Sequence, residues 1–239
     1  RIRMKLFGKK KSKAVAPVCR SFADAKRLLL IINPVSGKLK ARASAFDIIE
    51  IITDAGYVPT VMMTKYRGHA RELASTAEEH GFSRIVCCGG DGISSGSRLP
   101  IGYIPAGSTN DFASSLGIPT DLAAAAKTAV HGSSLTLDIG RFGEDRYFTY
   151  IASFGAFTAA SYSAPQNVKN NMGHLAYVFE GVKEFFKIKP IKVVCDDGEK
   201  VYRGDYVFGG VTNSTSVGGL VKLSSDMVGL DDGIFEVIL

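Results

Sequence analysis

Cysteine and histidine are scarce in this sequence, and neither has the spacing of a metal-binding site. The 239 residues include four cysteines and four histidines, and the histidines are scattered. Two cysteines, Cys87 and Cys88, are adjacent in an apolar run. Reduced thiols act there as small apolar groups. The pattern indicates a reducing compartment, and we expect a cytoplasmic protein.

Long apolar runs and an evenly spread charge are also missing. The most apolar run covers residues 28–32, far short of the roughly 20 residues that cross a bilayer. The net charge is +6, but residues 1–20 hold eight basic residues and no acidic one. The remainder has 21 basic and 23 acidic residues. This balance argues against a nucleic-acid partner.

This charge pattern therefore predicts that residues 1–24 are a basic leader outside the fold. Such a leader could touch anionic lipid, at about 1 kcal/mol for each Lys or Arg near the surface. The alternative, which we favour, is a disordered tail without a role. The start Arg1-Ile2-Arg3 before Met4 is also not expected to be a native beginning.

Strand and helix patterns alternate through the first half of the chain. Strands are expected where short apolar runs occur, and helices where apolar residues recur at helical spacing. The expected strands are 27–32, 57–63, 84–88 and 101–104, with helices at 45–55 and 70–77. This order predicts a doubly wound parallel sheet of the Rossmann-like α/β class.

After residue 133 the pattern changes to short alternating strands typical of antiparallel pairing. The expected strands are 135–139, 147–154, 191–195, 206–212 and 234–239, with one amphipathic helix at 175–186. We expect a mostly antiparallel β-sandwich or open barrel, and we place the boundary between residues 133 and 134.

Three loops that follow parallel strands carry the chemistry. The first is Asn33–Lys38, the second is Gly89–Gly92 and the third is Pro105–Phe112. Glycines allow sharp turns and close approach to a ligand, and Asp91 suits a metal–nucleotide complex or the activation of a hydroxyl. Loops that close parallel strands converge on one crevice. Each loop has a plainer alternative: a solvated turn, or capping of a helix.

The first and third loops suit phosphate without forming a Walker loop. Ser36, Lys38 and backbone N–H groups could surround a phosphate, but the long Gly-x-x-x-x-Gly-Lys spacing is missing. The third loop leads into an expected helix start, which favours anions. Ser108 offers a hydroxyl and Asp111 a second carboxylate.

In this order the three loops resemble the diacylglycerol kinase catalytic domain, which sphingosine kinases and bacterial lipid kinases share. The resemblance runs from about residue 27 to residue 239 and is strongest to the soluble bacterial diacylglycerol kinases. It implies an NAD kinase-like first domain, residues 25–133, that binds ATP. It also implies a lipid-substrate domain, residues 134–239, which we expect to be truncated at its C-terminal end.

The resemblance also implies roles for individual residues. Asp91 would act at the γ-phosphate with Mg²⁺, and Asp111, Asp138 and Lys38 would support it. The residues implied to line the nucleotide are Asn33, Pro34, Val35, Ser36, Gly37, Thr64, Gly90, Asp91, Gly92 and Ser108.

A structural Mg²⁺ site is implied near the end of the chain. Asp232 would bind through its side chain, and Gly229 and Ile234 through backbone carbonyls. Oxygen ligands suit Mg²⁺. From the residues alone, Asp231-Asp232-Gly233 is as easily a turn between strands.

Two departures from the family stand out. Ile93 follows Gly92 where the family has Thr and then a helix, and few residues remain before the strand at 101. Parallel crossovers need about a dozen residues or more, so we expect that a segment near 93–96 is missing from the sequence. The family's Asp-Gly-Glu motif, which carries its proposed base, is expected beyond Leu239. Asp197-Gly198-Glu199 is interpreted as a turn, so the chain is expected to be a catalytically incomplete fragment.

The leading hypothesis is an ATP-dependent kinase that phosphorylates diacylglycerol, giving phosphatidic acid, or a related lipid alcohol. One alternative is a non-catalytic lipid- or nucleotide-binding module. Another is an NAD kinase-like enzyme, because that group also uses a Gly-Gly-Asp-Gly loop. A cytoplasmic protein in transient, peripheral contact with a membrane surface is expected, and a homodimer is left open.

Overall fold

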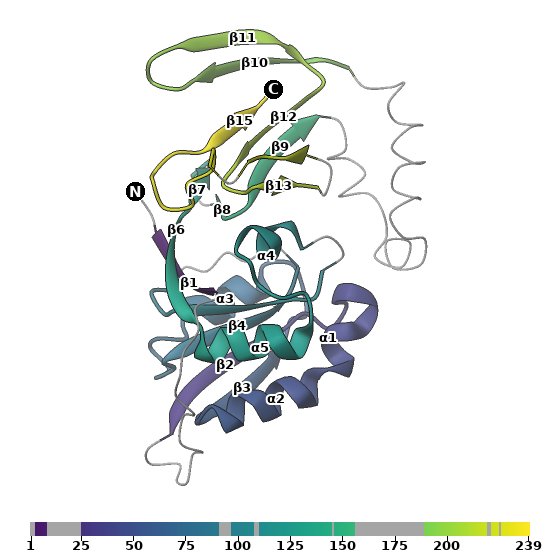
Figure 1. Cartoon of the computed structure of the whole chain (residues 1–239), viewed down its shortest axis with the longest axis vertical. Coiled ribbons are helices and arrows are strands. Elements are labelled where there is room, and N and C mark those ends of the chain that lie inside the picture. Colours follow the sequence, from purple (N-terminus) through teal and green to yellow (C-terminus); the bar gives the residue numbers. More distant parts are fainter. Residues whose placement is uncertain are drawn as a thin grey trace. The chain divides into compact units, whose positions relative to one another are not determined.

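The chain folds into two compact units, both traced in Figure 1. Unit 1 comprises Arg1–Tyr150 and Asn213–Ile234, and unit 2 comprises Ile151–Thr212 and Phe235–Leu239. The bounds of the two units reflect which residues contact one another in the folded chain. The boundary predicted between residues 133 and 134 separates domains by function, and it stays a prediction. The computed structural model describes residues 3–8, 25–90, 97–107, 110–144, 146–155, 189–218, 221–224 and 226–239.

Unit 1 contains the alternating strands and helices. Its strands are β1 (Arg3–Gly8), β2 (Lys26–Ile32), β3 (Tyr57–Met63), β4 (Arg84–Gly89), β5 (Ile101–Pro105), β6 (Ser133–Asp138), β7 (Gly140–Phe142), β8 (Arg146–Phe148), β13 (Ser216–Val217) and β14 (Val221–Lys222). Its helices are η1 (Ser36–Leu39), α1 (Lys40–Ala43), α2 (Ala45–Asp54), α3 (His69–Ser75), α4 (Asp111–Ser115) and α5 (Leu122–His131).

The main sheet of unit 1 has the order β3-β2-β4-β5-β1-β6. Strands β3, β2, β4 and β5 pair in parallel, which confirms the predicted parallel sheet. From β2 the chain moves outward to β3 and then returns to β4 on the other side of β2. This reversal is a topological switch point, and ligands bind beside the carboxyl ends of the strands at such a point.

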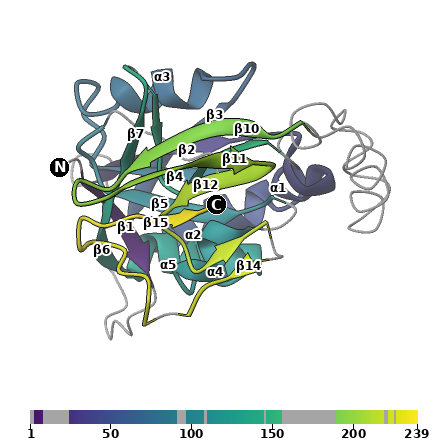
Figure 2. The same cartoon turned by 90° about the horizontal axis from the view of Figure 1, so that it is seen from above.

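Helices cover both faces of this sheet, so its central strands are buried. Figure 2 shows α2 and α5 on one face and α3 on the other. Residues Leu28–Ile32 of β2 are at most 3% exposed. Such a continuous apolar run is expected of a parallel strand that is covered on both sides. In α2, the buried Ile48 and Ile52 lie one turn apart and face the core.

Strand β1 differs from the expectation that residues 1–24 lie outside the fold. Residues 3–8 pair antiparallel with β6 along their whole length, and Leu6 is the parallel partner of Ile101 in β5. The sequence Arg3-Met4-Lys5-Leu6 does alternate as a strand does. Its basic residues obscured this short signal among the other charges of residues 1–20.

Unit 2 is antiparallel, as predicted for the second half of the chain. Its strands are β9 (Ile151–Gly155), β10 (Ile191–Asp196), β11 (Val201–Tyr206), β12 (Phe208–Thr212) and β15 (Glu236–Ile238). Strands β15, β12 and β9 form one sheet, and β10 and β11 form a hairpin.

The turn predicted at Asp197-Gly198-Glu199 is confirmed. Gly198 has a φ of +91°, and Asp197 Oδ1 accepts hydrogen bonds from the N–H groups of Glu199 and Lys200. Two other predictions, the missing segment near 93–96 and the helix at 175–186, lie outside the described residues.

A substitution at Gly102 in β5 tests how tightly the sheet packs against α5. A Cβ atom at this position would lie 2.7 Å from Ala129 Cβ and 3.0 Å from a Val86 methyl carbon. We expect Gly102→Ala to lower the free energy of unfolding by about 1–3 kcal/mol, because the site has no room for a methyl group. Denaturant titration of the wild type and the variant measures this difference in the free energy of unfolding. Gly90→Ala is the control, since a Cβ there meets nothing within 4 Å, and equal stability of the two variants would contradict the packing argument.

Candidate active site

The three predicted loops begin side by side at the carboxyl edge of the parallel sheet. The Asn33 N–H donates to the Cys88 carbonyl at 2.9 Å, and the Ala106 N–H donates to the Gly89 carbonyl at 2.8 Å. The first loop is thereby tied to β4, and the second is tied to the third. Strands β2 and β4 flank the switch point, so the loops surround the place where this fold class binds ligands.

Glycines allow these loops to touch backbone to backbone. Gly37 has a φ of +56°, and a Cβ there would lie 2.2 Å from the Ala106 carbonyl oxygen. A Cβ at Gly107 would lie 3.1 Å from the Cα of Gly90. A side chain at Gly37 would therefore clash and would also be strained by the left-handed backbone. The first loop contacts the third, and the third contacts the second.

The first loop is a tight turn built on Asn33. Its side-chain oxygen accepts the Val35 N–H at 3.2 Å, and its carbonyl accepts the Ser36 N–H at 3.2 Å. Ser36 is 5% exposed, and its hydroxyl would lie 3.7 Å from a Cβ at Gly89. The turn carries Pro34 and leads into η1, which contains the backbone of Lys38.

Thr64 joins this edge from the neighbouring strand. It follows β3, and its N–H donates to the Ile32 carbonyl at 2.9 Å. Thr64 therefore lies next to Ile32, the last residue of β2, which directly precedes the turn at Asn33. The polar residues after β2 and β3 share one edge of the sheet.

The third loop is closed by Asn110. The Gly107 N–H donates to Asn110 Oδ1 at 2.8 Å, and Asn110 Nδ2 donates to the Gly107 carbonyl at 3.2 Å. Asn110 has a φ of +52°, and Asn tolerates this region better than most residues do. The double hydrogen bond places Asp111 at the first position of α4.

Among the described residues of unit 1, two carboxylates are buried: Asp111 is 4% exposed and Asp138 is 2% exposed. Asp111 Oδ1 accepts a hydrogen bond from the Ser216 hydroxyl at 2.6 Å. Asp138 Oδ2 accepts from the Gly233 N–H, and the Asp138 N–H donates to the Leu230 carbonyl at 2.9 Å. Buried carboxylates are expensive unless such donors compensate them, so both side chains have fixed surroundings.

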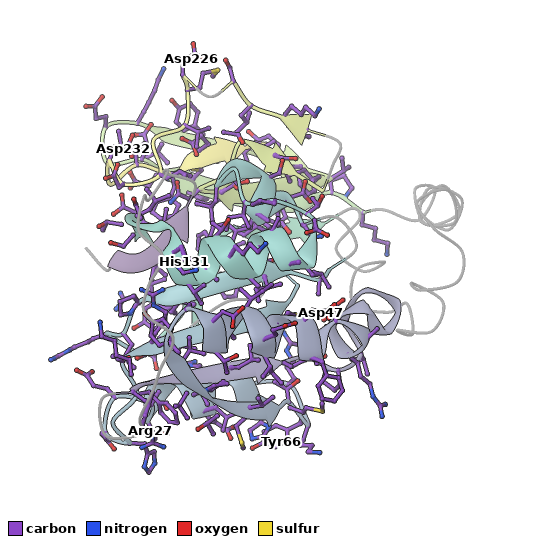
Figure 3. All side chains as sticks on the ribbon, turned by 60° about the horizontal axis from the view of Figure 1, so that its bottom comes forward. Arg27, Asp47, Tyr66, His131, Asp226 and Asp232 are labelled. Carbon is purple, nitrogen blue, oxygen red and sulfur yellow. The ribbon has the colours of Figure 1, made fainter. Side chains whose placement is uncertain are left out.

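The segment 229–234 holds the Asp232 carboxylate close to the backbone of Gly229 and Ile234, the other two predicted magnesium ligands. Asp232 Oδ1 accepts the Ile234 N–H at 2.9 Å. A Cβ at Gly229 would lie 2.2 Å from Asp232 Oδ2, so the carboxylate occupies the space that a side chain would fill. Figure 3 labels Asp232 in this segment. A carboxylate and backbone carbonyls are oxygen donors of the kind that Mg²⁺ prefers, so the residue types fit the ion.

No cluster of three or more His, Cys, Asp or Glu side chains occurs among the described residues. Of the other predicted site residues, Asp91, Gly92 and Ser108 lie outside the described part of the chain.

Residues 213–216, which the sequence analysis did not select, form hydrogen bonds to Asp111, Asp138 and Leu230. Asn213 Nδ2 donates to the carbonyls of Asp138 and Leu230, each at 3.1 Å. Ser216 contacts Asp111 as described above. The available signal was the run Thr212-Asn213-Ser214-Thr215-Ser216, because several small polar residues directly after an apolar strand are unusual in a core.

The position of Cys87 and Cys88 in β4 of the sheet changes the pKa of both thiols. Burial raises the pKa of Cys87 and of Cys88 to about 12. The neighbouring Cys88 adds to the effect on Cys87. Both thiols stay protonated near neutral pH, in line with the predicted packing role.

Comparison with known proteins identifies this architecture. Residues 27–142 match the family described as the diacylglycerol kinase catalytic domain. A diacylglycerol kinase of Bacillus subtilis (strain 168) is 34% identical over 224 residues, which cover 90% of this chain and 73% of that protein. The chain belongs to the diacylglycerol kinase catalytic-domain family. It is an enzyme, a diacylglycerol kinase-like lipid kinase.

Further relatives agree with this assignment. A diacylglycerol kinase of Staphylococcus saprophyticus is 30% identical, covering 90% of this chain and 72% of that protein. The crystal structure of a diacylglycerol kinase from Bacillus anthracis has the same fold, with a TM-score of 0.66 and 24% identity over 90% of this chain and 73% of that chain. No helix in the described part of this lipid kinase is long and apolar enough to cross a membrane.

Gly37→Ala tests the contact between the first and third loops. The left-handed backbone costs about 1–2 kcal/mol for a residue with a Cβ, and the clash with Ala106 adds to it. We expect a loss of stability clearly larger than in Gly143→Ala, whose φ is +71° but whose Cβ would meet nothing within 4 Å. Thermal unfolding compares the two variants, and equal losses would show that the loops do not touch.

The raised pKa of Cys87 and Cys88 predicts slow alkylation. With a pKa of about 12 in place of 9, each thiol has about a thousandfold less thiolate near pH 8. Iodoacetamide labelling followed by peptide mass spectrometry should modify both thiols much more slowly in the folded kinase, where Cys88 is buried and Cys87 is half-buried, than in guanidinium. Equal rates in the folded and unfolded states would contradict the burial.

Proposed function

We propose that this kinase transfers the γ-phosphate of ATP to the hydroxyl of diacylglycerol, giving phosphatidic acid, or to a related lipid alcohol. The observation that carries the proposal is the packing of the three loops at the switch point, with Asp111 buried near the end of the third. The names of the bacterial relatives support the choice of lipid.

In this proposal, the nucleotide lies along the carboxyl edge of β2, β4 and β5. Backbone N–H groups of glycine-rich turns are suited to phosphate oxygens. The residues proposed to line the nucleotide are Asn33, Pro34, Val35, Ser36, Gly37, Thr64, Gly90, Asp91, Gly92 and Ser108. The turn at Asn33 and the bonded pair Gly107 and Asn110 support this, since hydrogen bonds fix the backbone of both loops.

The reaction forms a bond between the lipid hydroxyl oxygen and the γ-phosphorus and breaks the bond to the bridging oxygen, so that ADP leaves. The hydroxyl proton passes to a nearby carboxylate. Phosphoryl transfer depends on positioning and charge stabilisation more than on covalent help. We assign catalytic roles to Asp91, Asp111 and Lys38, with Lys38 offsetting negative phosphate charge and Asp138 supporting the network.

We propose two places for Mg²⁺. One is with Asp91 at the γ-phosphate, where Mg²⁺ would neutralise charge that develops during transfer. The other is the structural site of Gly229, Asp232 and Ile234. At the second site the contact of Asp232 with Gly229 supports the proposal, because it holds the carboxylate beside the backbone that would supply the carbonyls.

Contact with a membrane surface is part of the proposal, because diacylglycerol resides in the bilayer. We place the enzyme in the cytoplasm, with transient, peripheral membrane contact. The homodimer stays a prediction.

The test uses the full-length protein and measures transfer of radiolabelled γ-phosphate from ATP to diacylglycerol in mixed micelles. Asp91→Asn should lower kcat at least about a hundredfold, since it removes the charge proposed to act at the γ-phosphate. Asp226→Asn is the matched control, because Asp226 is exposed and bonds Ser224 at the surface.

Full activity of Asp91→Asn would remove Asp91 from the site. Phosphorylation of NAD without phosphorylation of lipid would replace the proposed function by the NAD kinase-like alternative. Failure of the wild type to phosphorylate any lipid alcohol would favour the binding module.

A further inference from the structure

Helix α4 is bound to the distant segment 214–216 by a chain of hydroxyl groups. Ser115 Oγ lies 2.6 Å from Ser214 Oγ. The N–H and the hydroxyl of Thr215 donate to Ser115 Oγ at 3.2 and 3.1 Å. The two segments are about a hundred residues apart in the sequence, so these bonds exist only in the folded protein.

Each hydroxyl in this chain has one proton to donate. The Ser214 hydroxyl donates to the Ser216 carbonyl at 2.8 Å. The Ser115 hydroxyl lies 3.1 Å from the Asp111 carbonyl oxygen, to which it donates, and either serine can be the donor in the Ser115–Ser214 contact. Ser214 Oγ also accepts the Ser216 N–H at 3.2 Å. Ser214, which is fully buried, thus holds the Ser216 backbone at both its carbonyl and its N–H.

The Ser216 side chain is then directed at Asp111. Its hydroxyl lies 2.6 Å from Asp111 Oδ1, and an ionised carboxylate can only accept. Hydrogen bonds to charged groups are short and about twice as strong as neutral ones. Asp111 is 4% exposed, so water competes little for this oxygen.

We infer that Ser216 is a positioning residue for phosphoryl transfer: its hydroxyl fixes the orientation of the Asp111 carboxylate. The inference rests on the proposed function. Helix α4 has five residues, too few to be rigid through its own hydrogen bonds. A bond from a separate, anchored segment fixes the carboxylate more firmly than the helix can. Small displacements of a catalytic group are costly in reactions that depend on positioning.

The experiment measures kcat and KM for Ser216→Ala, Ser216→Thr and Ser224→Ala in the lipid phosphorylation assay. In Ser216→Ala we expect kcat to fall about tenfold, the typical effect of losing a hydrogen bond to a charged group. KM for ATP should change less than about twofold, because Ser216 does not touch the nucleotide in the proposed site. Ser216→Thr keeps the hydroxyl and should restore most of kcat.

Ser224→Ala is the matched control, because Ser224 donates to the Asp226 carboxylate in the same way at an exposed position. It should behave as the wild type. Thermal unfolding and ADP-binding stoichiometry of each variant give the folded, binding-competent fraction, and kcat is expressed per competent site. A merely structural role would lower that fraction and leave kcat per site unchanged.

Two results would overturn the inference: unchanged kcat per site in Ser216→Ala, or a Ser216→Thr variant as impaired as Ser216→Ala. Both results differ from failure of the proposed function, which would appear as absence of lipid phosphorylation by the wild type. That outcome would also refute the inference, because the inference rests on the proposed function.

Discussion

The contact between the backbones of three loops is the constraint on which the rest of the site depends. Parallel pairing of β2, β4 and β5 brings the loop starts to one edge, and hydrogen bonds from Asn33 and Ala106 fix them there. Only glycine at position 37 lets the first loop reach the carbonyl of Ala106. The buried apolar strands thus set the spacing of the polar residues that follow them.

The same constraint continues from the loops into the buried carboxylates. Asn110 closes the third loop and starts α4, so Asp111 is placed by the loop rather than by a long helix. Residues 213–216 then reach both acids: the Ser216 hydroxyl donates to the Asp111 carboxylate, and Asn213 donates to the backbone carbonyls of Asp138 and Leu230. The Ser216 hydroxyl and the Gly233 N–H donate to the two carboxylates, so they compensate the burial of these acids and also orient them.

Much of the fold was predictable because its signals are local. The apolar run 28–32 and the turn at Asp197 needed only neighbouring residues to be interpreted. The loops were found because each follows a strand of the predicted parallel sheet and because their order resembles that of the diacylglycerol kinase catalytic domain. Strand β1 was missed because six residues give a weak pattern among many charges. The pairing of Ser216 with Asp111 was not predictable, because it joins residues 105 positions apart through a tertiary contact.

Hydrogen–deuterium exchange with and without ADP and Mg²⁺ tests the central claim most directly, since it locates the nucleotide without requiring turnover. The account predicts added protection in residues 33–38, 89–92 and 105–111 and at Thr64, with little change in the β10–β11 hairpin. Protection that appears only in unit 2, or binding of ADP without protection of the three loops, would contradict a nucleotide site at the switch point.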